Sequence, residues 1–161
     1  NIGGTAQLAA EAARRRLRLV YLSSDYVYAD TPGPHREEEA LHPLNRYAWS
    51  KLGGECAVRL VPGSLIIRTT FGPRPFPYEK ATEDQLTSRL YVDEIAPLIV
   101  ELTEGDATGI LNIGGPVRTI LDFARQSRPD VRAVRRAEID DPLPTDSSLD
   151  LARWHEQRKK N

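Results

Sequence analysis

A serine pair, a tyrosine and a lysine are the residues of this chain whose types and spacing could do chemistry. Ser23 and Ser24 follow a short apolar run, and Tyr47 and Lys51 stand four positions apart in a stretch with helical spacing. Residues four apart project from the same face of a helix. A phenol titrates near pH ~10, so it is a poor acid or base at neutral pH unless a nearby ammonium favours its anion.

A hydroxyl, a phenol and an ammonium that converge on one point suit the interconversion of an alcohol and a carbonyl. The hydroxyl holds the oxygen that gains or loses the proton, the phenol moves that proton, and a hydride carrier completes the change. By itself a Tyr-x-x-x-Lys pair is usually a surface pair. The prediction therefore depends on the order of all three features and on the elements that carry them.

Periodicity indicates which elements position these residues. Helical spacing of apolar residues predicts helices over 5–16, 47–60, 91–103, 119–126 and 149–160. Short apolar runs predict buried strands over 17–23, 64–70 and 109–115. Thr5 and Thr119 are expected as N-caps. Alternating helices and buried strands predict an α/β fold with a parallel sheet, in which Ser23 and Ser24 lie at the strand edge that binds ligands.

Composition narrows the functional class. The chain has 161 residues, 40% hydrophobic and 28% charged, with a net charge of −1. These values indicate a globular protein with no basic field for nucleic acid, and no apolar run approaches the ~20 residues that a membrane helix needs. We therefore expect a cytoplasmic protein with neither nucleic acid nor membrane as a partner. The three histidines and Cys56 show no metal-ligand spacing, so no metal site is predicted and Cys56 is expected in the core.

The motifs resemble those of the extended short-chain dehydrogenases/reductases, a family of nucleotide-sugar epimerases, dehydratases and reductases. The resemblance runs from Asn1 to about Trp154, and its matching stretches are 1–5, 20–28, 43–55, 66–71, 84–85, 91–96 and 111–115. Ser-Ser-Asp-Tyr-Val over 23–27, followed by Pro-Leu-Asn-x-Tyr-x-x-x-Lys over 43–51, is most similar to the dTDP-4-dehydrorhamnose reductase branch. Arg89 departs from that branch and resembles the epimerase/dehydratase branch instead.

The resemblance implies a role for each matching residue. Ser24 would orient the sugar carbonyl, Tyr47 would donate the proton in reduction, and Lys51 would support Tyr47 and bind the nicotinamide ribose. The residues that would contact ligands are Ser23, Thr69 and Thr70 for the cofactor, together with Tyr47 and Lys51, and Asp25, Phe71 and Arg89 for the substrate. The implied cofactor is NAD or NADP, the implied substrate is a nucleotide-linked sugar, and the family also allows a homodimer.

The family's pyrophosphate site has no counterpart in the sequence. That site opens with a strand, a Gly-x-x-Gly-x-x-Gly turn and a helix, whereas Gly3-Gly4, Gly53-Gly54 and Gly114-Gly115 do not have this spacing. The chain also lacks methionine and starts on what resembles a mid-domain helix. We therefore expect roughly 70–90 residues with the pyrophosphate site before Asn1 in the intact protein.

In these terms the chain is the C-terminal portion of an NAD(P)-binding Rossmann fold with a small α/β substrate-binding part. Residues 1–72 are expected to form the second half of the dinucleotide-binding domain, residues 73–154 mainly the substrate-binding part, and residues 155–161 a polar tail. Half of a parallel sheet is expected to leave an apolar edge exposed. The acidic run 37–39 is expected to be solvated.

Three functions remain open at this point. The first is an NAD(P)-dependent reductase of a nucleotide-linked keto-sugar, and the second is a nucleotide-sugar epimerase or dehydratase with tightly held NAD. The third is a non-catalytic binding subunit, as in the regulatory subunit of methionine adenosyltransferase, which resembles these reductases. Because Ser24, Tyr47 and Lys51 are all present, the sequence favours an enzyme.

Overall fold

The computed structural model describes residues 1–160 of the chain. Its α-helices are α1 (Ile2–Arg15), α2 (Arg46–Val58), α3 (Val92–Glu104), α4 (Ile120–Arg125) and α5 (Ala152–Lys160). Its strands are β1 (Val20–Leu22), β2 (Leu65–Arg68), β3 (Phe71–Gly72), β4 (Lys80–Thr82), β5 (Leu86–Thr87), β6 (Leu90–Tyr91), β7 (Gly109–Asn112), β8 (Arg118–Thr119) and β9 (Arg132–Val134). Two 3₁₀ helices are η1 (Asp25–Val27) and η2 (Arg136–Glu138).

The main sheet has three strands in the order β1-β2-β7, and both pairs are parallel. Val20 lies opposite Leu65 in the first pair, and Arg68 lies opposite Asn112 in the second. Parallel neighbours need a crossover connection, and α2 and α3 supply it here. The predicted α/β fold is thus confirmed, with β1 at one edge of the sheet.

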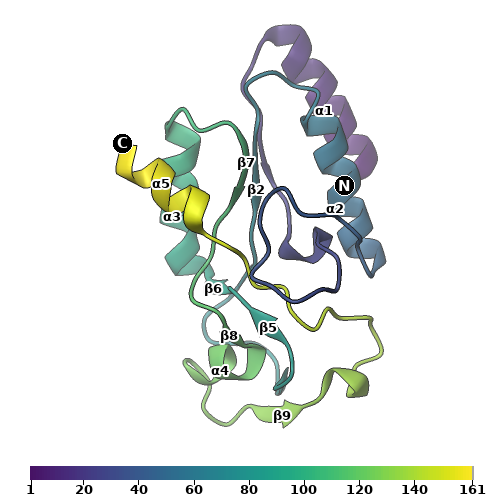
Figure 1. Cartoon of the computed structure of the whole chain (residues 1–161), viewed down its shortest axis with the longest axis vertical. Helices are drawn as coiled ribbons and strands as arrows, with labels where there is room; N and C mark the ends of the chain where they lie inside the picture. The colour runs from purple at the N-terminus through teal and green to yellow at the C-terminus, as the bar shows by residue number, and fades with distance from the viewer. Residues whose placement is uncertain (161) are drawn as a thin grey trace.

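Helices cover both faces of this sheet (Figure 1), with α1 and α2 on one side and α3 and α5 on the other. The largest core cluster lies on the α3 side, where Leu65 and Ile67 of β2 pack with Ile95 of α3 and Trp154 near the start of α5. Helix α5 therefore packs against the core through Trp154. Residues 155–160, expected as a polar tail, continue this helix.

The second part of the molecule is built from three two-stranded pairs and α4. The pairs β3–β6 and β4–β9 are parallel, and β5–β8 is antiparallel. A separate cluster centred on Phe76, Tyr91 and Phe123 forms its core. Figure 1 places this part beyond the ends of β2 and β7, next to the edge where the sheet presents its carboxyl ends. Thr119 caps α4 as predicted, because its side chain accepts a hydrogen bond from the Asp122 amide at 3.0 Å.

Apolar residues at every fourth position predict one buried stripe on helix α2, made of Ala48, Leu52, Cys56 and Leu60, but the helix buries a partly different set of residues. The expectation that Cys56 lies in the core is wrong, because Cys56 is exposed and Leu60, beyond the helix end, is 81% exposed. The close contacts come from two glycines instead. A Cβ on Gly53 would lie 2.8 Å from Ile2 of α1, and one on Gly54 would collide with the Tyr21 hydroxyl of β1. The glycines therefore let α2 approach both neighbours closely.

Two further expectations are wrong. Thr5 is not an N-cap, because the helical backbone already begins at Ile2 and Asn1 occupies the capping position. The acidic run is not simply solvated, because Glu37 is buried and accepts a hydrogen bond from the Asn112 amide at 3.0 Å. Glu39 pairs with the buried ring of His35 at 2.7 Å. Glu37 and His35 therefore lie in the interior near the end of β7, whereas Glu38 is exposed as expected.

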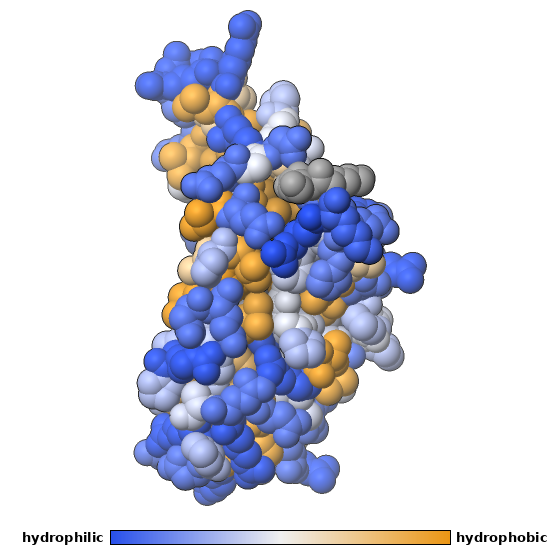
Figure 2. Space-filling model, turned by 90° about the vertical axis from the view of Figure 1, so that its left-hand side faces the viewer, coloured by the Kyte–Doolittle hydropathy of each residue, from blue (hydrophilic) through white to orange (hydrophobic). Residues whose placement is uncertain are grey.

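The surface carries several apolar side chains on and near α1, including Ile2 and Leu8, which are each more than half exposed. On the face that carries the C-terminal helix, hydrophilic side chains dominate the two ends and hydrophobic patches lie along the middle (Figure 2). No helix within residues 1–160 combines the length and apolar character that a membrane crossing requires.

Candidate active site

A cavity of about 300 Å³ lies at the carboxyl ends of β1 and β2. Its lining contains every site residue that the sequence singled out, namely Ser23, Ser24, Asp25, Tyr47, Lys51, Thr69, Thr70, Phe71 and Arg89, together with Leu22 and Tyr26. These residues come from β1 and its following turn, from α2, from the end of β2 and from the loop before β6. The fold therefore brings the predicted residues to one place.

The turn after β1 is held by hydrogen bonds to β2 and the residues that follow it, and by one within the turn. The Ser23 amide donates to the carbonyl of Ile67 at 2.7 Å, and the Asp25 amide donates to the carbonyl of Thr69 at 3.2 Å. Ser24 caps η1, because its hydroxyl oxygen accepts from the Tyr26 amide at 3.2 Å. These contacts continue the β1–β2 pairing beyond the strands and place Ser24 at the cavity wall.

Helix α2 supplies Tyr47 and Lys51. The helix begins at Arg46, directly after Asn45, whose side-chain oxygen accepts from the Ala48 amide at 2.9 Å. Tyr47, in the first turn, is 55% exposed and lines the cavity. The ammonium of Lys51 donates to the carbonyl of Leu22 at the end of β1.

Lys51 is half-buried, and this burial lowers the pKa of its ammonium, against the attraction of the Glu55 carboxylate. The ammonium also lies 4.5 Å from the centre of the Tyr21 ring. The Lys51 side chain thus helps to join helix α2 to strand β1.

The hydroxyl of Ser23 has a structural partner. It donates to Glu55 Oε1 at 2.5 Å, and Glu55 forms a buried ion pair with Arg68. Although Ser23 lines the cavity, its hydroxyl therefore belongs to the interior network beneath it. Thr69 differs, because its hydroxyl oxygen is buried and has no hydrogen-bond partner among residues 1–160.

Asp25 is almost completely buried, and burial raises the pKa of its carboxyl group to about 6. Four contacts oppose that rise: the hydroxyl of Ser147, the positive charge of Arg89, the hydroxyl of Ser24 and the amide of Tyr26. Asp25 is thus a titratable group near neutral pH at the wall of the cavity. Arg89 is held beside it by donation from its Nε to the Thr70 hydroxyl at 3.3 Å.

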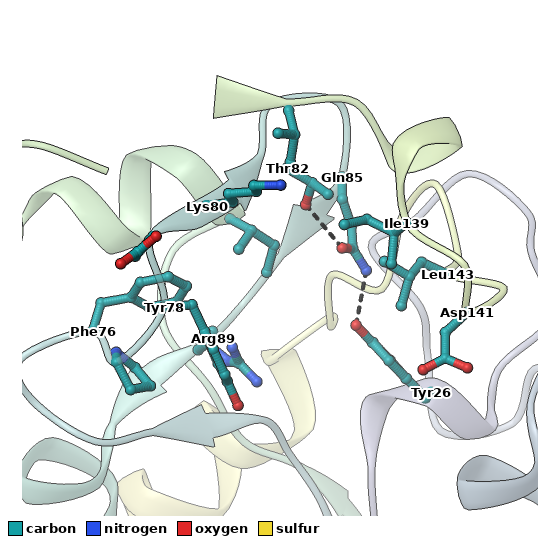
Figure 3. A pocket seen from close by; sticks show the side chains of 15 residues that line it. Tyr26, Phe76, Tyr78, Lys80, Thr82, Gln85, Arg89, Ile139, Asp141 and Leu143 are labelled. Carbon is teal, nitrogen blue, oxygen red and sulfur yellow. Dashed lines mark hydrogen bonds between the residues drawn. The ribbon is translucent and has the colours of Figure 1, made fainter. Parts of the chain in front are cut away.

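A larger pocket of about 800 Å³ adjoins the cavity and shares Tyr26 and Arg89 with it (Figure 3). The Gln85 side chain donates to the Tyr26 hydroxyl at 2.9 Å and accepts from the Thr82 hydroxyl at 3.0 Å. The other residues that line the larger pocket include aromatic, cationic and acidic side chains, namely Phe76, Tyr78, Lys80, Glu79 and Asp141.

Most of this pocket was not predicted as a site. Phe76, Tyr78 and Lys80 lie in a proline-punctuated segment without periodicity, and Asp141 lies more than fifty residues further along. The pairing of β4 with β9 brings these segments together. The one available signal was the Asp84-Gln85 pair, which belongs to the family resemblance but carried no role.

Within residues 1–160 there is no cluster of three or more His, Cys, Asp or Glu side chains arranged to hold a metal ion. The buried His35 instead packs on the Tyr28 ring, with ring centres 4.8 Å apart.

Known proteins resemble this chain in sequence and in fold. Residues 1–72 match the family model described as the RmlD substrate binding domain. The dTDP-4-dehydrorhamnose reductase of Aggregatibacter actinomycetemcomitans is 30% identical over 121 residues, which cover 65% of this chain and 41% of that protein. The methionine adenosyltransferase 2 subunit beta of Bos taurus is 48% identical over 58 residues, which cover 36% of this chain and 17% of that protein.

The fold comparison covers nearly the whole chain. The structure of dTDP-4-dehydrorhamnose reductase from Bacillus anthracis in complex with NADP superposes with a TM-score of 0.84 at 22% identity, covering 98% of this chain and 65% of that one. Further similar structures contain NAD. The resemblance to the extended short-chain dehydrogenases/reductases, and within them to the dTDP-4-dehydrorhamnose reductases, is thus confirmed. The chain spans less than half the length of the curated relatives that it matches.

Proposed function

We propose that this chain carries the catalytic and substrate-binding residues of an NAD(P)-dependent reductase of nucleotide-linked keto-sugars. The observation that carries the proposal is the convergence of Ser24, Tyr47 and Lys51 on one cavity that adjoins a larger pocket. The matched relatives named as dTDP-4-dehydrorhamnose reductase and dTDP-4-keto-6-deoxy-D-glucose reductase support the substrate class.

The residues fit the nicotinamide end of a dinucleotide. Lys51 is a three-proton donor with one donor directed to the carbonyl of Leu22, so it has further protons for ribose hydroxyls. A buried hydroxyl without a partner is costly, and Thr69 Oγ1 would gain one from a ligand in the cavity. When bound, the nicotinamide would supply the hydride that reduces the carbonyl carbon.

Tyr47 would then move the proton. Its phenol donates a proton to the carbonyl oxygen while the hydride adds to the carbonyl carbon, so that the ketone becomes a secondary alcohol. The phenolate that remains regains its proton from solvent, and Lys51 lines the same cavity. Ser24 holds the carbonyl oxygen in line with Tyr47. Because Tyr47 is at the open side of the cavity, solvent reaches it between turnovers.

The larger pocket suits the nucleotide part of such a substrate. Its volume of about 800 Å³ lies in the usual range of ligand sites, about 300–1,000 Å³. Lys80 and Arg89 supply positive charge for a diphosphate, and Phe76 and Tyr78 supply aromatic faces for a base. Arg89 lines both spaces, so it stands where a diphosphate would join the sugar to the nucleoside.

The test is Tyr47→Phe in the natural full-length polypeptide, assayed with dTDP-4-dehydrorhamnose and NADPH or NADH. We expect kcat/KM to fall by about 10²–10⁴-fold, because the proton donor is lost, while cofactor affinity measured by fluorescence titration stays nearly unchanged. Tyr91→Phe is the matched control, since it removes a tyrosine hydroxyl bonded to the Phe123 carbonyl away from the cavity. Unchanged turnover in Tyr47→Phe would refute the assignment.

Two observations each favour an alternative function. The presence of Arg89, a residue type found at this place in the epimerase/dehydratase branch, favours an epimerase or dehydratase as the second candidate. Such an enzyme would transform the sugar without net consumption of NAD(P)H. The match to methionine adenosyltransferase 2 subunit beta favours a non-catalytic subunit, which would bind cofactor without turnover in the wild type.

A further inference from the structure

A buried serine from the C-terminal segment reaches the wall of the candidate active site. The hydroxyl of Ser147 donates to Asp25 Oδ2 at 2.8 Å, although the two residues are 122 positions apart. The Ser147 amide donates to the carbonyl of Leu86 at 3.0 Å, and the next residues are held by donation from the Leu149 amide to the Ser88 hydroxyl at 3.1 Å. Ser147 is therefore fixed in the interior by backbone contacts on both sides.

The other oxygen of the same carboxylate leads to Ser24. The Ser24 hydroxyl donates to Asp25 Oδ1 at 3.0 Å and accepts from the Tyr26 amide at 3.2 Å. Ser147, Asp25 and Ser24 thus form one chain of hydrogen bonds that ends at the cavity. All three residues are buried.

These hydrogen bonds limit whether Ser24 can donate to a substrate or only accept from it. A hydroxyl has one proton and two lone pairs, and one lone pair of Ser24 already accepts from the Tyr26 amide. When Asp25 is ionised, the Ser24 proton points to the carboxylate and only a lone pair remains for the cavity. A ketone oxygen is an acceptor, so it requires the proton instead.

We propose that Asp25 and Ser147 are positioning residues that set the direction of the Ser24 hydroxyl proton. With the Asp25 carboxyl protonated, that group donates to Ser24, and Ser24 donates into the cavity. With the carboxylate ionised and held by Ser147, Ser24 is an acceptor, which suits a substrate alcohol. This inference rests on the proposed function, in which Ser24 holds the reacting oxygen, and it replaces the expectation that Asp25 contacts the substrate.

The groups around Asp25 decide at which pH its carboxyl group changes from protonated to ionised. Arg89, from the loop before β6, favours the carboxylate, and Tyr26 lies beside it on η1. Tyr47 and Lys51 of α2 line the same cavity, while Ser147 is the neutral contact from the C-terminal segment. Burial outweighs these contacts and raises the pKa of Asp25 to about 6. Ser147 therefore acts to keep the carboxylate ionised.

The experiment is the pH profile of kcat/KM for reduction of dTDP-4-dehydrorhamnose by NADPH, measured on the natural full-length polypeptide. In the wild type we expect reduction to decline as the pH rises through about 6. Ser147→Ala removes a hydrogen bond that favours the carboxylate, so the decline moves to higher pH by roughly 0.5–1 unit. Asp25→Asn removes the decline.

The matched control is Ser148→Ala. Ser148 is equally buried in the same segment, but its hydroxyl donates to Asp146 Oδ1 at 2.6 Å and not to Asp25. A decline that stays at the wild-type pH in this variant, together with a shifted one in Ser147→Ala, supports positioning by Ser147. An equal shift in both variants would overturn it. If Ser147→Ala does not fold, Asp25→Asn decides, since a persisting decline overturns the inference.

Two readouts separate this inference from the proposed function. If Tyr47→Phe abolishes turnover while Asp25→Asn and Ser147→Ala keep the wild-type profile, only the positioning inference fails. If Tyr47→Phe leaves turnover unchanged, the proposed function fails. The carbon-13 carboxyl shift of Asp25, followed against pH by NMR, tests the Ser147 contact without turnover, because Ser147→Ala should move that titration upward. An unmoved titration would overturn the contact's role.

Discussion

Two buried carboxylates at the carboxyl end of β1 have opposite environments. Glu55 of α2 is fully buried and meets the Arg68 guanidinium at two points, 3.0 Å from Nε and 2.8 Å from Nη2. The Ser23 hydroxyl also donates to it. Asp25 is nearly as buried, but its direct partners are the hydroxyls of Ser24 and Ser147 and a backbone amide, and Arg89 acts on it only through space.

The difference separates a structural carboxylate from one placed to act at the cavity. A buried carboxylate in a two-point ion pair supports the fold, because removal of either partner leaves the other buried without its counterpart. A carboxylate held by hydroxyls loses much of its hydration without a full opposite charge, so its pKa rises into the range where proteins work. Glu55 thus supports the fold beneath the cavity, and Asp25 is suited to act at its wall.

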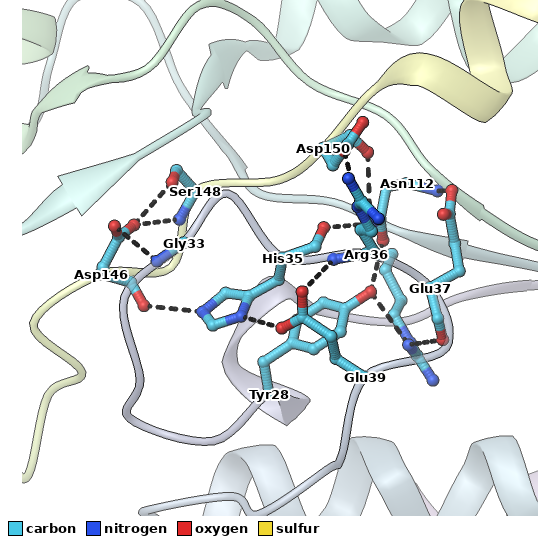
Figure 4. A network of polar contacts seen from close by, with 11 residues as sticks. Tyr28, Gly33, His35, Arg36, Glu37, Glu39, Asn112, Asp146, Ser148 and Asp150 are labelled. Atoms are coloured by element: carbon cyan, nitrogen blue, oxygen red, sulfur yellow. Dashed lines mark hydrogen bonds and ion pairs between the residues drawn. The ribbon is translucent and has the colours of Figure 1, made fainter.

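The Arg68 ion pair is the centre of a wider network. Its Nη1 donates to the Tyr28 hydroxyl at 3.0 Å and to the Glu37 carbonyl at 3.1 Å, and the Tyr28 hydroxyl donates to Asn112 Oδ1 at 2.8 Å. Asn112 in turn donates to the His35 carbonyl at 2.8 Å. Figure 4 shows how this network joins the loop after η1 to the end of β7 and to the C-terminal segment.

The largest expected effect comes from breaking the structural pair. Arg68→Met leaves the buried carboxyl group of Glu55 without the Arg68 guanidinium, so the free energy of unfolding should fall by about 3–5 kcal/mol. Urea denaturation of the natural full-length polypeptide measures it.

Arg59→Ala is the control for that change, because Arg59 is an exposed partner of the same Glu55 carboxylate at 3.5 Å. It should cost less than about 1 kcal/mol. Equal losses in the two variants would contradict the structural role assigned to the buried pair.

Asp25→Asn should have an effect on stability that depends on pH. The folded-state pKa of about 6 is above the unfolded value, so the stabilisation from protonated Asp25 is complete below about pH 4 and is lost as the pH rises through 6. Asparagine does not titrate. The unfolding free energy of the variant relative to wild type should therefore rise between pH ~4 and ~7, by about 2–3 kcal/mol.

Denaturation at a series of pH values measures that difference. A difference that is constant across the range would show that Asp25 titrates alike in both states, and the contrast with Glu55 would fail.

The smallest effect concerns one hydroxyl of the network. Tyr28→Phe removes the group that accepts from Arg68 and donates to Asn112, which leaves two buried polar groups short of a partner. The expected loss of unfolding free energy is about 1–3 kcal/mol, read from thermal or urea denaturation. Tyr78→Phe, at a tyrosine 64% exposed, should stay within about 0.5 kcal/mol and serves as the control.

Much of the cavity was predictable because its residues follow local rules. Ser23 and Ser24 end an apolar strand, and Tyr47 and Lys51 share a helical face, so periodicity alone brought them to one edge of a parallel sheet. The stripe on α2 was wrong at Cys56 because glycines, not apolar side chains, make the close contacts of that helix.

The sequence by itself determined the alternation of the three main strands with helices, and it brought Ser23, Ser24, Tyr47 and Lys51 to one sheet edge, because spacing along one element decides which side chains share a face. The other predicted residues of the cavity came from the family resemblance. Only the tertiary structure decided the ionisation of Asp25, the interior place of Glu37 and the contact of Ser147. The physical reason is that burial and partnership come from segments far apart in the chain. The sequence alone does not show whether a carboxylate is paired with an arginine or with a serine in the folded protein.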